Sequence, residues 1–139
     1  MEQRDYFQKQ LDKLGRALGK VLADLSGLKS QGKVSLGIEI SNKALKNELD
    51  LDIEDLILMQ TEEFVDELKT KKKFTNENLG NLADILLLLA DNSHEEQEKN
   101  EKSIKLYEKC LSIYEYLGTT GTTYSFDWHS KIERIKNIL

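Results

Sequence analysis

The sequence contains no proline and only one cysteine in its 139 residues. Because proline breaks helix interiors more strongly than any other residue, its absence means that no position forces a helix to end. Cys110 has no second cysteine with which to form an internal disulfide. We therefore expect a fold that is stabilised by packing alone, in a reducing compartment.

Long apolar runs are also missing. The richest run, residues 82–90, is far shorter than the roughly 20 residues that a membrane-spanning helix needs. Residues 1–8 are too polar for a signal peptide. With 39% hydrophobic and 32% charged residues, the composition is that of an ordinary globular protein. We expect a cytoplasmic protein, with residues 1–139 forming a single domain and no membrane partner.

Basic residues are too scattered to predict a nucleic-acid partner. The net charge is −5, and the one basic cluster, Lys69 and residues 71–73, follows the acidic segment 39–67. Phe74 is its only aromatic neighbour. Nucleic-acid binding usually requires a continuous basic face, so we expect no nucleic acid among the partners.

The first predicted helix, residues 4–29, carries two stripes. Gly15, Gly19 and Ala23 form a stripe of small residues, about 120° round the helix from an apolar seam. A helix that must bury both sides has more apolar surface than one neighbouring hairpin covers. The seam therefore predicts a homodimer interface, with the core of the single chain as the open alternative. Its apolar residues follow an alternating four-three spacing: Phe7, Leu11, Leu14, Leu18, Val21, Leu25 and Leu28.

Two further helices are predicted before residue 75. Residues 34–48 form the second, although residues 34–41 alternate with a period of two, as in a strand. Its only β-like partner, residues 122–126, is short, and two-stranded ribbons are marginal in water; helix is therefore expected, with strand left open. The third helix, residues 53–71, follows Asp52 as its N-cap. Its inward-facing residues are Leu56, Ile57, Phe64 and Leu68.

The fourth predicted helix begins after Thr75 as N-cap. Phe74 and Leu79 have the spacing of a hydrophobic staple around this cap. The body of the helix, residues 82–90, is apolar nearly all round, which predicts the most buried helix of the fold.

Two helices complete the chain. A capping box of Ser93 and Glu96 predicts the start of the fifth helix, which ends at Leu117 before Gly118. Residues 118–123 form a Gly-Thr loop. Ser125 caps a last helix, residues 126–138. We expect four of its apolar residues to close the end of the stack: Trp128, Ile132, Ile135 and Leu139.

An internal repeat connects two of these helices. Ser103, Tyr107, Cys110 and Leu111 have the small-large spacing of a repeat helix, and a weaker copy lies 66 residues earlier at Gly37, Ser41, Ala44 and Leu45. Two units of about 34 residues account for that offset. The pattern resembles the tetratricopeptide (TPR) superfamily. That resemblance implies an all-α fold of about six helices in antiparallel hairpins, arranged as a TPR-like right-handed stack.

A second resemblance begins with Asp5 and Tyr6 and continues through the Leu-Gly-Arg-Ala-Leu-Gly-Lys-Val-Leu segment at 14–22. Together with Gly32, Ala44, Leu45 and the Leu-Tyr-Glu-Lys block at 106–109, it is similar to a group of uncharacterised bacterial proteins described as TPR-like. That group implies a fold and no activity. We therefore expect a non-catalytic protein-protein interaction module. Tyrosines suit interfaces, and Tyr116 and Tyr124 join the seam as candidate interface residues.

The residues that could take part in catalysis or ligand binding do not form a convincing site. The alternative function is a small-molecule or phosphate-binding protein, or an enzyme, that uses the Gly-Thr loop at 118–129. Asp127 and His129 point about 200° apart on a helix, and no P-loop lysine follows the glycines. His94 and Glu98 are too few for a metal site. We expect no cofactor, no metal and no catalysis.

Overall fold

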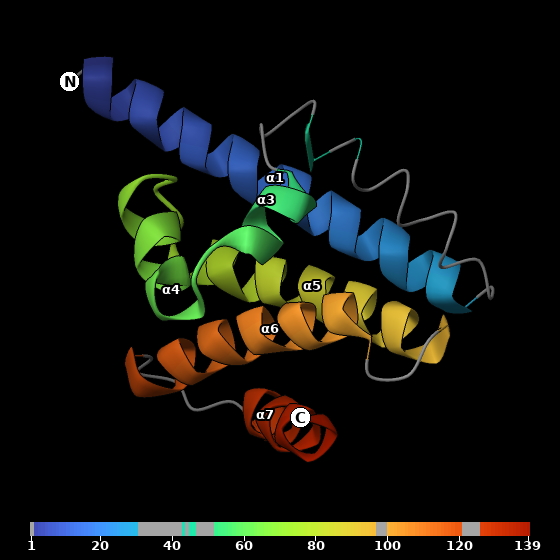
Figure 1. Cartoon of the computed structure of the whole chain (residues 1–139). Helices are drawn as coiled ribbons and strands as arrows, with labels where there is room; N and C mark the ends of the chain where they lie inside the picture. The colour runs from blue at the N-terminus through green and yellow to red at the C-terminus, as the bar shows by residue number, and fades with distance from the viewer. Residues whose placement is uncertain (1, 31–42, 44, 47–51, 97–99, 121–125) are drawn as a thin grey trace.

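Every regular element in the described part of the chain is a helix, which confirms the all-α class. The computed structural model describes residues 2–30, 43, 45–46, 52–96, 100–120 and 126–139. Most of the predicted second helix, including residues 34–41, lies outside these ranges. The helices, shown in Figure 1, are α1 (Glu2–Ser30), α3 (Ile53–Leu58), α4 (Thr61–Thr70), α5 (Asn76–Glu96), α6 (Glu101–Thr120) and α7 (Phe126–Ile138).

The first helix has the predicted extent and packs against α5. The described part of its leucine seam belongs to the core of the single chain. A side chain at Gly15 would bring its Cβ within 3.1 Å of Asn78 Oδ1, whereas Gly19 has open space. The small-residue stripe therefore marks a close approach between helices at Gly15 only.

The predicted third helix is wrong in one respect, because it is two helices. The backbone becomes extended at Met59 and Gln60, between α3 and α4. This break places Thr61 against α6, where its carbonyl accepts a hydrogen bond from Ser112 Oγ at 3.4 Å. Asp52 caps α3 as predicted, accepting from the Glu54 amide at 2.9 Å. The predicted inward-facing residues of both helices are buried.

Helix α5 is the central helix, as its composition predicts. It lies between α1 and α6 (Figure 1). Thr75 Oγ1 accepts a hydrogen bond from the Asn78 amide at 3.1 Å, and Phe74 and Leu79 are both buried beside this cap. Its fully buried side chains are Leu79, Leu82, Ala83, Ile85, Leu86 and Ala90.

The junction between α5 and α6 differs from the prediction. Helix α5 continues through Ser93, and α6 begins only at Glu101. Asn100 supplies the cap: its Oδ1 accepts from the Ser103 amide at 2.8 Å, while its Nδ2 donates to the Ser93 carbonyl at 2.9 Å. The side chain of Asn100 therefore closes the start of α6 onto the end of α5, a role that the Ser93 capping box does not have.

The C-terminal part follows the prediction more closely. Helix α6 continues through Gly118 to Thr120, so the first half of the predicted Gly-Thr loop is helical. Helix α7 has the predicted bounds. Ile135 is buried, and Trp128 and Ile132 are partly buried, but Leu139 is 48% exposed and does not close the stack. The described helices include none that is long and apolar enough to cross a membrane.

Candidate functional site

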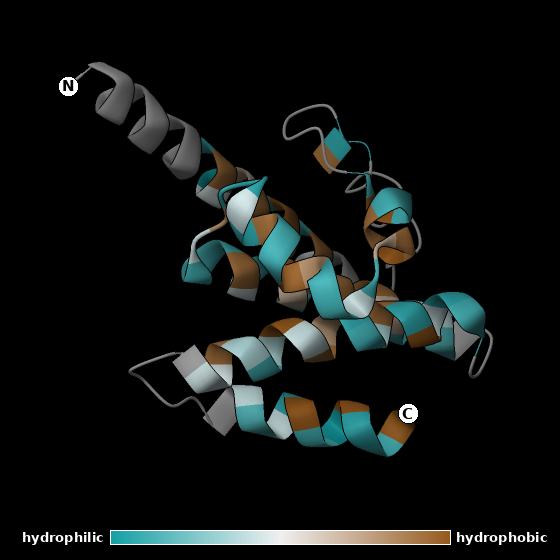
Figure 2. Ribbon diagram, turned by 60° about the vertical axis from the view of Figure 1, so that its left-hand side comes forward, coloured by the Kyte–Doolittle hydropathy of each residue, from teal (hydrophilic) through white to brown (hydrophobic). Residues whose placement is uncertain are grey.

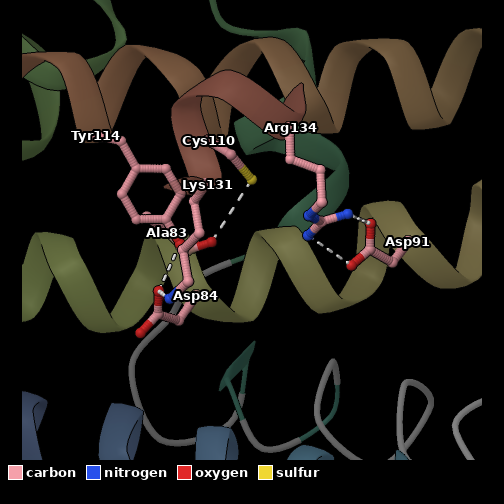
Figure 3. A network of polar contacts seen from close by, with 7 residues as sticks. All are labelled: Ala83, Asp84, Asp91, Cys110, Tyr114, Lys131 and Arg134. Atoms are coloured by element: carbon pink, nitrogen blue, oxygen red, sulfur yellow. Dashed lines mark hydrogen bonds and ion pairs between the residues drawn. The ribbon is translucent and has the colours of Figure 1, made fainter. Parts of the chain in front are cut away.

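A network of polar contacts lies where α5, α6 and α7 meet (Figure 3). Asp84 on α5 accepts a hydrogen bond from the Tyr114 hydroxyl of α6. The same carboxylate forms an ion pair with Lys131 of α7, with 3.0 Å between Nζ and Oδ1. One acidic side chain thus connects three helices.

A second carboxylate repeats this arrangement two turns further along α5. Asp91 Oδ1 accepts from the Tyr107 hydroxyl of α6 at 2.6 Å. Arg134 of α7 binds both oxygens of Asp91, with NH1 2.9 Å from Oδ1 and NH2 3.1 Å from Oδ2. Such bidentate charge-assisted pairs are among the strongest hydrogen-bonded contacts in proteins.

Helical periodicity explains why the arrangement occurs twice. The two aspartates are seven residues apart on α5, and Tyr107 and Tyr114 are seven residues apart on α6. Seven residues are about two turns, so each pair shares one face of its helix. Because α5 and α6 form an antiparallel hairpin, the earlier aspartate meets the later tyrosine.

Two hydrogen-bond donors of the network, Tyr107 and Arg134, keep their protons at neutral pH. Burial, reinforced by the hydrogen bond to Asp91, raises the pKa of Tyr107 well above its usual value. The hydrogen bond to Asp91 also raises the pKa of Arg134. Tyr107 therefore stays protonated and Arg134 stays charged at neutral pH. The arrangement holds helices together and leaves Tyr107 unsuited to proton transfer.

Cys110 occupies the tight crossing between the two halves of the network. Its thiol is fully buried and donates to the Ala83 carbonyl at 3.5 Å (Figure 3). Burial raises the pKa of this thiol well above its ordinary value. A protonated, enclosed thiol is a poor nucleophile, as expected for a packing residue.

A second polar cluster joins α4 to α6. Lys109 is only 3% exposed, and its ammonium donates to Thr61 Oγ1 at 2.9 Å and lies 5.6 Å from the centre of the Phe64 ring. Burial lowers the pKa of Lys109. Nearby, Lys69 contacts Tyr116 through both its hydroxyl and its ring, 4.5 Å from the ring centre. Both lysines therefore connect α4 to α6.

The predicted interface residues do not come together on the surface. Tyr116 is partly buried against α4, and the side chains of Leu11 and Tyr124 lie outside the described residues. The other four have exposed fractions between 0% and 9%, so they form no free surface in the single chain. These residues, Leu14, Leu18, Val21 and Leu25, pack inside the single chain because α5 covers this side of α1.

The candidates for chemistry lie only partly within the described residues. His129 is exposed, and the side chain of Asp127 lies outside the described residues. His94 packs its ring edge-on against Tyr107, with 6.0 Å between ring centres. Within the described ranges, no group of three or more His, Cys, Asp or Glu side chains is placed to hold a metal ion.

Comparison of the chain with protein-family models, curated proteins and solved structures found no match. The site is therefore interpreted from its geometry. The sequence carried one signal that our predictions did not use: two aspartates on one helix and two tyrosines on the next, each pair seven residues apart. The cations of α7 carried no comparable signal, because they are three residues apart.

Proposed function

We propose that this protein is a non-catalytic, cytoplasmic interaction module that binds another protein, a second copy of itself included. The proposal rests on the observation that the polar side chains between the helices bind one another. Asp84 and Asp91 each bind a tyrosine and a cation of neighbouring helices. An acid-base catalyst needs a side chain aimed at its substrate. These groups instead determine how the helices pack against one another.

We further propose that the module is of the TPR-like type, and the α5–α6 hairpin supports this. Small residues allow close approach at its crossing: Cys110 lies against the Ala83 carbonyl, and Ser103 is 1% exposed. The large side chains of Tyr107 and Tyr114 fill the space on either side. Helical repeats build their cores from this alternation of small and large residues and keep an outer face for partners.

The proposal includes self-association, but through a surface other than the leucine seam. Because α5 covers the described part of the leucine seam, two copies would have to meet through other residues. Light scattering measures the outcome directly: a dimer has twice the 16.0 kDa mass of the chain. A constant 16.0 kDa mass up to high concentration would exclude self-association and leave a different protein as the partner.

Photo-crosslinking in the native cell tests the proposal as a whole. A crosslinking residue would replace Leu58, Glu115 or Lys136, three exposed positions on α3, α6 and α7. An interaction module gives at least one discrete product containing a second polypeptide, and only after irradiation. The proposal fails if none of the three positions gives a discrete product and the purified chain is a monomer.

A further inference from the structure

Helix α7 is attached to the rest of the fold by two ion pairs as well as by apolar packing. Of its described side chains, Ile135 alone is fully buried, and Trp128, Ile132 and Ile138 are partly buried. Helix α5, in contrast, is buried on nearly every side. Hydrophobic burial scales with the area removed from water, so α7 receives much less of it, and its two ion pairs carry a correspondingly larger share of the attachment.

The surface beneath α7 has the features of a helix-binding face. It presents Asp84 and Asp91, whose side chains are 29% and 16% exposed even with α7 in place. Tyr114 and Tyr107 hold the two carboxylates from the α6 side. Hydrogen bonds from neighbouring groups fix acceptors in position before a ligand arrives, which reduces the cost of binding.

The segment seated on this face shows which chemistry the face accepts. Figure 2 shows α7 beside α6, with hydrophobic and hydrophilic residues alternating along it. Its central sequence is Lys131-Ile132-Glu133-Arg134-Ile135. The two cations, three residues apart, bind the two carboxylates, and Ile135 enters the core.

We propose that the α5–α6 face beneath α7 is a docking site for an amphipathic helix of another protein, and that α7 is its resident intramolecular ligand. The partner helix carries basic residues at positions i and i+3 and apolar residues at i+1 and i+4. This inference rests on the proposed interaction function and identifies its surface. Binding requires α7 to leave, and the partner competes with a tethered helix whose effective concentration is in the millimolar range.

Peptide binding to the full-length chain tests the proposal. The double variant Lys131→Glu/Arg134→Glu replaces both ion pairs with like-charge contacts to Asp84 and Asp91, which should weaken the hold of α7 on the face. A labelled peptide of residues 126–139 should bind this variant more tightly than it binds the wild-type chain, whose own α7 competes. A control peptide with the same two charge reversals should bind at least about tenfold more weakly. Raising the salt concentration should weaken binding of the native peptide.

Two results would overturn the proposal: equal binding of the native and charge-reversed peptides, or no binding to a folded variant. Hydrogen exchange on the wild-type chain covers the case in which the variant unfolds. Amides of α7 should exchange through a local opening that salt promotes, while those of α5 exchange only with global unfolding. Equal, salt-independent protection of α7 and α5 would show that the face never opens and would refute the proposal.

The two levels of the proposal can fail separately. A cellular crosslink without peptide binding leaves the interaction function in place and removes this face as its surface. Peptide binding together with no cellular crosslink and a monomeric purified chain removes the interaction function while the helix-binding face remains.

Discussion

Asp91 binds Arg134 through both carboxylate oxygens, across 43 positions of sequence. Tyr107 donates to one of the same oxygens at 2.6 Å, so three helices converge on one side chain. The planar guanidinium suits this geometry because it can point one N–H bond from each terminal nitrogen at the two carboxylate oxygens. In the equivalent place on Asp84, Lys131 donates from its single ammonium nitrogen to Oδ1.

Replacing Arg134 by lysine should therefore cost more than replacing Lys131 by arginine. Arg134→Lys keeps the charge and loses the parallel pair of hydrogen bonds. Because Arg134 is 46% exposed and solvent screens the pair, we expect a loss of about 1 kcal/mol or less in the free energy of unfolding. Urea denaturation measures it. Equal stability of Arg134→Lys and the wild type would show that the bidentate geometry contributes nothing.

Tyr107→Phe tests the α6 side of the same carboxylate. The hydroxyl is lost while the ring, only 1% exposed, keeps its packing. Asp91 then loses one buried donor, and we expect unfolding to become easier by about 1–3 kcal/mol. Tyr116→Phe is the matched control, because that side chain is partly exposed and its hydroxyl contacts a surface lysine. A larger effect at Tyr116 than at Tyr107 would contradict the assignment.

Lys109→Met should be neutral or stabilising, although it removes a hydrogen bond to Thr61. A buried ammonium costs free energy, and an apolar side chain of similar length avoids that cost. Burial lowers the pKa of Lys109 in the folded protein from its ordinary value of 10.5. The unfolded chain therefore binds more protons between the two pKa values, and wild-type stability rises with pH across that interval.

The stability of Lys109→Met should lack this contribution to the pH dependence. Its advantage over the wild type is expected to shrink as the pH approaches 10.5. Urea denaturation at a series of pH values between 7 and about 10 measures the difference. A constant difference across the series would show that burial does not shift the titration of Lys109.

Periodicity predicted the elements whose pattern is local. The four-three spacing of Leu14, Leu18, Val21 and Leu25 located α1, and the apolar run at 82–90 located the central helix. The helix predicted to follow Ser125 has the observed bounds of α7. In these segments each residue's environment depends on neighbours three or four positions away, which a sequence displays directly.

The wrong predictions concern places where a residue distant in the sequence determines the local structure. The break at Met59 and Gln60 depends on contacts between Thr61 and α6, about fifty positions away. The leucine seam of α1 predicted that this side of the helix is buried. Its spacing did not show whether α5 or a second copy of the chain covers it. The polar network was missed for the same reason, because its cations lie on a third helix.

Asn100→Ala should destabilise the protein more than Ser93→Ala does. Asn100 accepts from the Ser103 amide and donates to the Ser93 carbonyl, so its loss opens both sides of the α5–α6 junction. Loss of an N-cap costs about 0.5–2 kcal/mol. Ser93 contributes only its hydroxyl contact with Asn100, at 3.1 Å. Thermal unfolding of the two variants ranks them. The reverse order would restore the capping box that the sequence predicted.

Leu18→Ala separates the two roles available to the leucine seam. Leu18 is fully buried in the single chain, so its truncation leaves a cavity and should lower the free energy of unfolding by about 2–5 kcal/mol. Leu58→Ala is the control, because that side chain is 73% exposed and its truncation should change stability by about 0.5 kcal/mol or less.

Light scattering on the same two variants completes the test. If Leu18 serves only the core, Leu18→Ala lowers stability without changing the mass of whichever species the wild type forms. A change from dimer to monomer at constant unfolding free energy would instead place Leu18 between two copies. Because cavity cost and dissociation respond differently to protein concentration, unfolding measured at two concentrations distinguishes them: a core residue gives the same loss at both.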